Sequence, residues 1–566
     1  MIRREITKLI EKSIKTVQKK GVFPKFDISD IGIEHPEEKT HGDYATNIAM
    51  QIVRTVKKNP MEIAKIISSQ LFIINKKTRL FERIEVVTPG FINFFLSKKY
   101  LQKQVEEIIK ERSDVLRIGK NKTVNIEFIS ANPTGLLHLG NGRGAFFGDS
   151  LANVLEKAGY KVTREYLINN AKVNTQIRLL GKTALGRGKT YLNEYLISQV
   201  RKLQPKFKNK SESETGYLIA QEIQKDIKNF IERKLKIKFD SWISEERFYK
   251  EGRIKKVYNW LKKKKLIYQK EGAEWLRISK FGAPKDEVII RQTGEPTYFL
   301  SDIVYHKDKF SRNFQKIIDI WGADHQGHVP KIEAISKILG YKGQLDILIS
   351  QMMRLKRGKI SKRKGKIITL ESLIDEVGLD TVKFFYLMKS FDTQMEFDVE
   401  LAKKRSAKSP VYYVQYAHAR ICAILRKCGK SEILISKFET NSKATLRGVS
   451  HHIRSSKIPN SKLKLLTHPS ELELIKGLIR LPEIIEDTAK DYQIQRIPQY
   501  AIDLAASFHQ FYRDCRVLPA PHQTEGSGMG TEDRLLSEAR MGLVLATKTV
   551  MKNTLSLMGI SAPERM

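Results

Sequence analysis

The sequence predicts an α/β protein of three parts: a small N-terminal α/β domain, a central Rossmann-like domain with a parallel sheet, and a C-terminal all-α helical bundle. The first two observations are two separate strand–helix–strand patterns, each typical of a βαβ unit in a parallel sheet. The third observation is apolar spacing typical of helices after residue 396. The expected elements are strand 123–129, helix 145–158, strand 162–168, strand 316–321, loop 322–328, helix 331–339 and strand 345–349.

Changes of pattern along the chain predict the domain boundaries. Residues 1–112 begin with an amphipathic helix and end after a β-like run and a charged helix. Residues 120–395 hold both βαβ units, with a lysine-rich insertion at about 183–287, and residues 396–566 form the helical part. Ligands of parallel sheets bind at the carboxyl ends of the strands, so we expect the functional site there.

Composition narrows the class of protein. The 566 residues include 102 Lys and Arg against 63 Asp and Glu, a formal net charge of +39. This surplus favours a phosphate-rich partner, although a general lysine bias spread over all surfaces would give the same count. No apolar run is long enough for a membrane span. Only three cysteines occur, none in a CxxC pair, so we expect no disulfide framework and no zinc site, in a cytoplasmic protein.

The densest group of candidate functional residues lies at the first strand-to-helix turn, residues 130–144. Its four glycines, Gly135 and Gly140 among them, allow a ligand to approach the backbone, and helix amides there would face a phosphate. His138 would donate to a phosphoryl oxygen. The structural alternative is a tight turn around a packed histidine, which the accompanying Asn141 and Arg143 make the weaker interpretation.

A second candidate is the segment 356–366, which consists mostly of Lys, Arg and Gly and follows a strand-like run. Such a loop suits the clamping of a polyphosphate, with Lys359 and Lys362 as mobile positive charges, but a solvated basic loop is an equally good interpretation of this segment alone. The stretch 183–190 is not a P-loop, because Thr183 stands where the first glycine must be.

Together these motifs resemble the signatures of class I aminoacyl-tRNA synthetases: HLGN at residues 138–141 is similar to HIGH, and KISKR at 359–363 is similar to KMSKS. The longer motif EFISANPTG at 127–135 resembles the arginyl-tRNA synthetase family. Further matching motifs lie along nearly the whole chain, at 41–47, 89–93, 294–298 with Asp302, 322–325, 413–420, 508–512 and 562–566.

The resemblance implies an arginine–tRNA ligase that joins L-arginine to ATP as arginyl-adenylate, releases pyrophosphate, and transfers the arginyl group to the 3′-terminal adenosine of tRNA(Arg). Mg²⁺ is expected with the ATP, held mostly by phosphates and water. No covalent enzyme intermediate is expected, because positioning and charge stabilisation suffice. Family habit implies a monomer and a tRNA requirement for adenylate formation.

The resemblance also assigns roles to residues of this sequence. Catalysis falls to His138, Lys359, Ser361 and Lys362, and ATP binding to Gly135, His138, Gly140, Asn141, Lys359 and Lys362. Arginine binding falls to Ser130, Asn132, Asn141, Tyr298, Asp302 and His325. A guanidinium fits carboxylates and planar acceptors, and Tyr298 and Asp302 share one face if their segment is helical. In the helical domain Tyr412, Tyr413 and Tyr416 are candidates for stacking on tRNA bases, although most of them should pack in the core.

Two positions depart from the family pattern, namely Asn141 for the second histidine of HIGH and Asn170 for the usual Asp. Asp302 could instead pair with Lys307 or His306. Other class I enzymes are alternatives: a cysteinyl enzyme would need zinc ligands, and a glutamyl enzyme should select a carboxylate with basic residues. A third possibility is a non-catalytic RNA-binding relative, which the lysines of segment 356–366 argue against because binding alone needs no pyrophosphate stabilisation.

Overall fold

The central sheet has five strands, all parallel, in the order β11–β10–β4–β5–β6. Their bounds are β4 Thr123–Glu127, β5 Lys161–Ile168, β6 Ser241–Ser244, β10 Lys316–Gly322 and β11 Gln344–Ser350. The computed structural model describes the chain except residues 29, 111–115, 357–368, 405–408, 430–459 and 519–530. The predicted parallel sheet and its two βαβ units are confirmed. Strand β6 comes from the lysine-rich stretch 183–287.

Three helices and a 3-10 turn connect or cover these strands: α6 Leu139–Lys157, α12 Tyr298–Ser311, η5 Ala323–His328 and α13 Val329–Leu339. Helix α6 begins at Leu139 and not at residue 145, so the expectation of a turn up to Gly144 was wrong. Glycine is a poor helix former, but a capping box at His138 and Asn141 satisfies the first amides, and Gly142 has no room for a Cβ beside Tyr386.

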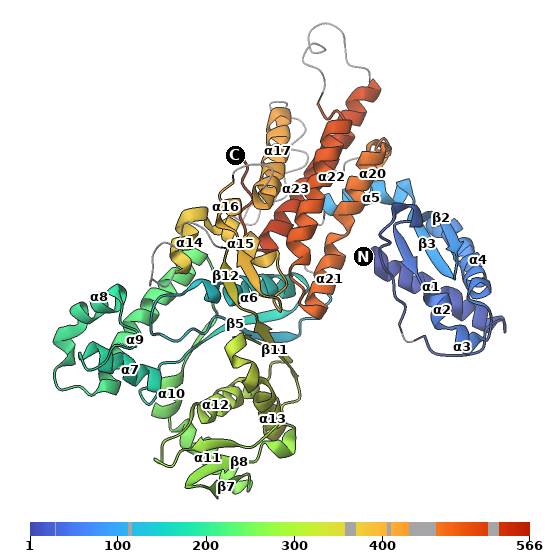
Figure 1. Cartoon of the computed structure of the whole chain (residues 1–566). Helices are drawn as coiled ribbons and strands as arrows, with labels where there is room; N and C mark the ends of the chain where they lie inside the picture. The colour runs from blue at the N-terminus through green and yellow to red at the C-terminus, as the bar shows by residue number, and fades with distance from the viewer. Residues whose placement is uncertain (29, 111–115, 357–368, 405–408, 430–459, 519–530) are drawn as a thin grey trace, which may run out of the picture.

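The residues between β5 and α12 form two further groups, one helical and one with a small sheet. The helical group, at the left of Figure 1, is α7 Thr175–Ala184, α8 Glu194–Leu203, η2 Gln204–Phe207, α9 Glu212–Asn229 and the π-helical η3 Phe230–Leu235. The second group, at the bottom, is α10 Glu245–Lys250, α11 Arg253–Lys263, β7 Ile267–Lys270, β8 Ala273–Leu276, η4 Ser279–Phe281 and β9 Glu287–Ile290. Strands β7, β8 and β9 form an antiparallel sheet.

The N-terminal domain is an antiparallel sheet β1–β3–β2 packed with helices. Its elements are α1 Ile2–Lys19, η1 Lys39–His41, β1 Tyr44–Thr46, α2 Ile48–Gln51, α3 Val53–Val56, α4 Pro60–Thr78, β2 Phe81–Val87, β3 Phe91–Leu96 and α5 Lys98–Lys110. Helix α1 buries one apolar stripe, Ile2, Ile6, Ile10, Ile14 and Val17, as its helical spacing predicts.

After the sheet the chain forms β12 Met353–Leu355, α14 Leu370–Val377, α15 Leu379–Leu387, β13 Met395–Phe397 and α16 Val399–Ala402, with β12 and β13 paired in parallel. The helical domain follows with α17 Pro410–Gly429, α19 Asn460–Leu463, α20 Pro469–Ile479, α21 Leu481–Asp491, α22 Arg496–Asp514 and α23 Thr531–Leu557. The predicted C-terminal helical architecture is therefore confirmed for the described residues.

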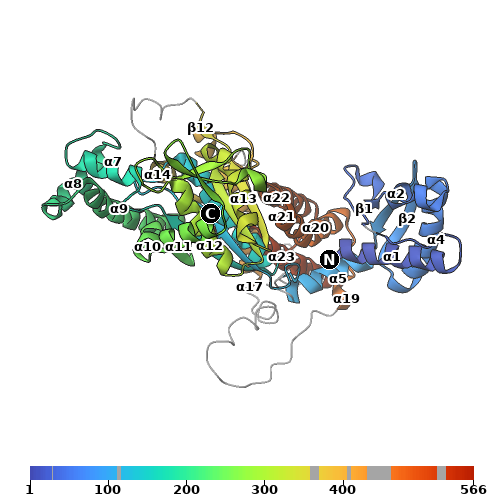
Figure 2. The ribbon, with the colours of Figure 1, turned by 90° about the horizontal axis from the view of Figure 1, so that it is seen from below.

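The N-terminal and helical domains meet along α21. Buried Glu483 accepts hydrogen bonds from the Tyr44 hydroxyl (3.2 Å) and the Arg3 amide (3.1 Å), and its other oxygen lies 2.9 Å from His35 Nε2. Arg3 also pairs with Asp487 at 2.7 Å. These contacts hold the N-terminal domain beside the helices, and the molecule is elongated from this domain to α8 (Figures 1 and 2).

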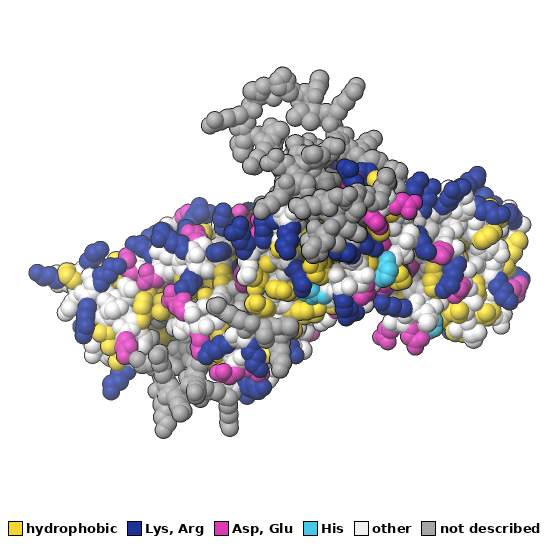
Figure 3. Space-filling view, turned by 90° about the horizontal axis from the view of Figure 1, so that it is seen from above, with side chains coloured by type: hydrophobic (Ala, Val, Ile, Leu, Met, Phe, Trp, Pro, Cys, Tyr) yellow, Lys and Arg dark blue, Asp and Glu magenta, His cyan; other side chains and the backbone are white. Residues whose placement is uncertain are grey.

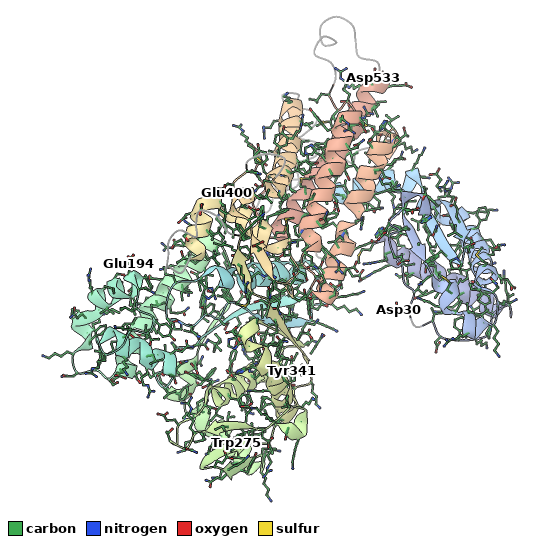
Figure 4. All side chains as sticks on the ribbon, in the orientation of Figure 1. Asp30, Glu194, Trp275, Tyr341, Glu400 and Asp533 are labelled. Carbon is green, nitrogen blue, oxygen red and sulfur yellow. The ribbon has the colours of Figure 1, made fainter. Side chains whose placement is uncertain are left out.

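Basic side chains are spread over the face seen in Figure 3, from the α7–α9 end to the N-terminal domain. In Figure 4, Glu194 on α8, Trp275 on β8 and Asp533 on α23 mark three separate projections of the molecule around the sheet. No helix among the described residues is long and apolar enough to cross a membrane.

Candidate active site

The chain turns sharply where β4 ends. Ile129 and Ser130 both have positive φ angles, 70° and 36°, which non-glycine residues rarely adopt, so the turn is locally strained. The turn brings the Ser130 hydroxyl to Glu127 Oε1 at 2.8 Å, and the same hydroxyl accepts the Leu167 amide of β5 at 3.1 Å. Ser130 is therefore fixed between two strand ends by its neighbours.

His138 occupies the N-cap of α6. Its Nδ1 accepts the Gly140 amide at 3.1 Å, while Asn141 Oδ1 accepts the His138 amide at 2.9 Å. Burial by neighbouring atoms lowers the pKa of His138, and Asp324 of η5 partly opposes this shift. At neutral pH the ring is thus mostly neutral, with Nε2 left over for a ligand. Asn141, one of the two departures from the family pattern, acts here as a helix cap.

The predicted catalytic residues Lys359, Ser361 and Lys362 lie outside the described residues, but both flanks of their segment are described. Thr369 forms a bridge with His138, and the next amide, of Leu370, donates to the Leu137 carbonyl at 2.9 Å. On the other side, Lys356 pairs with Asp398 at 3.0 Å. The chain that follows the basic segment, at Thr369 and Leu370, is therefore anchored at the histidine turn.

Three buried carboxylates form a row across the sheet. Asp319, Glu127 and Glu165 occupy the same register on β10, β4 and β5. Lys309 of α12, fully buried, reaches Glu127 at 2.7 Å and Asp319 at 2.6 Å. Burial alone would lower the pKa of Lys309, but the two carboxylates outweigh it and raise that pKa. The lysine is therefore charged and neutralises part of the row.

The other hydrogen bonds and ion pairs of the carboxylate row come from α12 and from the residue directly after it. The Tyr305 hydroxyl lies 2.9 Å from Glu127 and 2.8 Å from Glu165, and Arg312 forms a two-pronged ion pair with Glu165. Burial opposes ionisation of Glu165, but the Arg312 contact prevails and lowers its pKa. Sequence analysis did not find this row, because its members are far apart in the chain and only the strand register aligns them.

Tyr298 and Asp302 lie at the beginning of α12, as the helical interpretation of their spacing predicts. Burial raises the pKa of Asp302 to about 7, and Glu245 and Glu127 add to the shift, while His306 and Lys331 oppose it. In the described part of the chain no donor bonds to its carboxylate. His306 instead pairs with Asp319 at 3.1 Å, and Lys307 lies over the Trp260 ring, so the alternative pairing of Asp302 is wrong.

A small cavity opens beside Tyr298, lined also by Glu245, Tyr249, Asn174 and Val173. The Tyr298 hydroxyl donates to Asn174 Oδ1 at 2.9 Å and accepts the Thr175 amide at 2.7 Å. Burial raises the pKa of Glu245. Glu245 is an acidic residue of this region that sequence analysis missed, because the strand β6 directly before it is too short to be recognised from the sequence.

The remaining predicted pocket residues lie around the histidine turn and the beginning of α12. Asn132 is exposed in the turn after Ser130, and a Cβ on Gly135 would meet no atom within 4 Å, so the backbone there is open. His325 lies on η5 with half of its side chain exposed, 3.5 Å from Asp324. Asn170, the second departure, accepts from Ser244 Oγ at 2.8 Å and from the Glu246 amide at 3.2 Å, so it joins β5 to β6 and α10.

The three tyrosines of α17 lie at one face of the helical domain. Tyr412 and Tyr416 are stacked, with ring centroids 6.1 Å apart and planes within 10°. Tyr413 and Tyr416 both contact the ring of His509 on α22, and Tyr416 is 39% exposed while its two neighbours are half-buried. The structure therefore brings the three together and leaves Tyr416 the most accessible.

Comparison with known proteins assigns all three parts of the chain. Residues 4–96 match the model "Arginyl tRNA synthetase N terminal domain", residues 104–180 and 187–385 match "tRNA synthetases class I (R), catalytic domain", and residues 414–566 match "DALR anticodon binding domain". The parallel sheet with its histidine turn thus defines a class I aminoacyl-tRNA synthetase.

Curated relatives identify the amino acid. The arginine–tRNA ligase of Caldanaerobacter subterraneus subsp. tengcongensis is 39% identical over 100% of this chain and 99% of its own length, and that of Bacillus subtilis is 38% identical over 100% of both. The chain belongs to the arginine–tRNA ligase family.

Solved structures agree in fold. Arginyl-tRNA synthetase of Thermus thermophilus superposes with a TM-score of 0.72 at 19% identity, covering 100% of both chains, and that of Plasmodium falciparum with 0.75 at 18%, covering 100% of this chain and 99% of that one. The family excludes the cysteinyl and glutamyl alternatives. The protein is an enzyme that activates arginine with ATP and ligates it to tRNA.

Proposed function

We propose that arginine is held by residues at the amino end of α12 and after β4. ATP is held at the histidine turn, at the amino end of α6. The observation that carries the proposal is Asp302, a desolvated carboxylate with no bonding partner in the described chain and with other carboxylates around it. A guanidinium supplies the missing positive charge and a planar set of donors. Tyr298, one turn earlier, borders the same place, and Ser130, Asn132, Asn141 and His325 complete the proposed arginine pocket.

ATP is proposed to lie against Gly135, His138, Gly140 and Asn141, at the amino end of α6. The neutral His138 ring would donate from Nε2, and the open backbone at Gly135 allows close approach of a nucleotide. Lys359, Ser361 and Lys362 are proposed to stabilise the departing pyrophosphate; the anchoring of Thr369 at His138 supports their approach to the same phosphates.

Magnesium is proposed to arrive with ATP as part of the substrate. No group of three or more Asp, Glu, His or Cys side chains suited to a metal occurs in the described residues. The chain therefore offers Mg²⁺ no cage of its own there, and phosphate oxygens and water would supply most ligands. Zinc has no proposed role.

For tRNA(Arg) we propose that Tyr412, Tyr413 and Tyr416 contact splayed bases, with Tyr416 contributing most because its ring is the most exposed. The functional units are proposed to be residues 1–112, 120–395 with an insertion at about 183–287, and 396–566. A monomer is proposed from the resemblance to the family, and a cytoplasmic location from the reaction, which uses the tRNA and ATP of that compartment.

Asp302→Asn tests the arginine site. In arginine-dependent exchange of labelled pyrophosphate into ATP, measured with total tRNA present, the KM for arginine should rise about 100-fold, because a desolvated charge pair broken on one side costs about 2–5 kcal/mol. Asp308→Asn is the matched control: Asp308 is on the same helix but pairs with Arg253, so its KM should stay within about twofold. An unchanged KM in Asp302→Asn would remove Asp302 from the pocket.

A further inference from the structure

Arg143 of α6 carries a buried charge that is bonded mainly by backbone carbonyls. It is 2% exposed, and its acidic neighbour Asp392 attracts it through space without forming an ion pair among the described residues. Its Nη2 donates instead to the carbonyls of Ser390 (2.7 Å), Phe391 (3.1 Å) and Thr393 (3.0 Å). Burial lowers its pKa, but a guanidinium remains charged at neutral pH. A buried charge is costly, so these contacts require an explanation.

The three carbonyls belong to one turn, residues 390–393, which leads into β13. The Phe391 carbonyl also accepts the Gln351 amide at 3.1 Å, and Met395 donates its amide to the Met352 carbonyl at 3.1 Å. Gln351 and Met352 precede β12, which ends at Leu355. Arg143 therefore holds the turn that is hydrogen-bonded to the residues entering β12.

The histidine turn lies at the amino end of α6, close to Arg143. Arg143 lies in the second turn of a helix that begins directly after His138. One turn later Phe147 stacks on Phe391 with ring centroids 4.0 Å apart, and the Tyr386 hydroxyl donates to the Leu139 carbonyl at 3.1 Å. Figure 1 shows β12 and α15 beside α6, so the two structures are neighbours in space.

We propose that Arg143 is a positioning residue that sets the placement of the histidine turn relative to the strand pair β12–β13. A guanidinium suits this task because its rigid, planar fork of five donors holds several carbonyls in fixed directions, whereas an ammonium has three donors on a flexible stem. The consequence rests on the proposed ATP site at the amino end of α6: phosphates held at the histidine turn need that turn in its place against the strand pair, and a displacement of about 1 Å costs about 100-fold in rate.

Two substitutions and a control test the proposal in the full-length enzyme. Arg143→Met keeps the length and removes the donors; Arg143→Lys keeps the charge and most of the volume. Arg164→Met is the control, because Arg164 is also largely buried beside α6 but bonds Glu156 and Asn153 near the other end of the helix. For each variant we would measure kcat and KM values in tRNA-dependent pyrophosphate exchange, the Tm, and tRNA binding on filters.

The expected order of kcat is parent, then Arg143→Lys, then Arg143→Met, with the last about 10- to 100-fold below the parent. The KM for arginine and the Kd for tRNA should change less than about twofold. Arg164→Met should lower Tm at least as much as Arg143→Met but leave kcat near the parent value. Parent-like kcat in Arg143→Met, or equal losses of kcat in the two methionine variants, would overturn the proposal.

Two further comparisons, with Arg143→Lys and His138→Ala, decide the remaining outcomes. If Arg143→Met does not fold, Arg143→Lys decides, since a kcat at least about fivefold lower at unchanged Tm supports positioning and a parent-like kcat refutes it. His138→Ala separates this inference from the proposed site. If His138→Ala keeps full kcat, the ATP placement fails; if it loses kcat while the Arg143 variants do not, only the positioning role fails.

Discussion

In the proposed arginine site the ionised form of Asp302 pairs with the guanidinium, so arginine binding should weaken as the pH falls below 7. Burial raises the pKa of the free carboxyl to about 7. Glu245 on α10 and Glu127 on β4 add to this shift, and His306 on α12 and Lys331 on α13 oppose it. A bound guanidinium must lower the same pKa, so arginine binding releases a proton wherever free Asp302 is still protonated.

The magnitude follows from the ionised fraction of Asp302. With a pKa of about 7, that fraction is about 10% at pH 6, 50% at pH 7 and 90% at pH 8. The affinity for arginine should therefore rise about tenfold from pH 6 to pH 8, or about 1.4 kcal/mol, with most of the change below pH 7. At pH 7 about half a proton should leave for each arginine bound.

Calorimetric titration of the enzyme with arginine measures both quantities. Titrations at pH 6, 7 and 8 give the Kd, and repeating the titration at pH 7 in buffers of different ionisation enthalpy gives the protons released. Asp302→Asn should bind weakly and show no such pH dependence. The reasoning is refuted if the parent binds arginine equally well at all three pH values, or if Asp302→Asn keeps the parent's slope.

Three other changes test the structure around the site. Lys309→Met removes the cation between two buried carboxylates and should lower the free energy of unfolding by about 3–5 kcal/mol in urea titrations, so parent-like stability would contradict the network. Asn141→Ala removes the cap acceptor of the His138 amide and should cost about 1 kcal/mol in thermal unfolding, while Asn141→Asp, which keeps an acceptor, should cost less. Tyr416→Ala should weaken tRNA binding on filters by about 5- to 150-fold, the value of one stacked base; an unchanged Kd would place the ring in packing only.

The sheet was predictable because its strands are short apolar runs at βαβ spacing. Strand β5 begins at Lys161 against an expected 162, and β11 at Gln344 against 345. The beginning of α6 was not predictable from propensity, since its first turn holds glycines, and the cap at His138 outweighs them. Strand β6, with only four residues inside a lysine-rich stretch, has too little pattern to be read as a strand.

The candidate site divides in the same way. Local motifs are sufficient to propose Ser130, His138, Tyr298 and Asp302 as site residues, because motif residues lie close together in the chain or on one helix turn. The partners of these residues were not, since a carboxylate row depends on register between strands that are distant in sequence. Arg143 was visible as a motif residue, but its ligands are backbone carbonyls, which no sequence pattern marks.

Helix α12 both supplies positive charge to the carboxylate row of the sheet and carries Asp302, whose carboxylate has no bonding partner among the described residues. Lys309 lies in the last turn of α12 and Arg312 directly follows the helix, and both meet the carboxylates of the sheet, while Asp302 lies about two turns before Lys309 on the same side. Because the pKa of Asp302 is raised well above its ordinary value, the unpaired carboxyl costs the folded protein a few kcal/mol relative to the unfolded chain. This loss of stability grows as the pH rises from the ordinary range of Asp toward 7, and a cation bound to the carboxylate removes it. In the proposed site, the substrate guanidinium therefore does at Asp302 what Lys309 does at Asp319, and a neutral or acidic amino acid would leave the charge uncompensated.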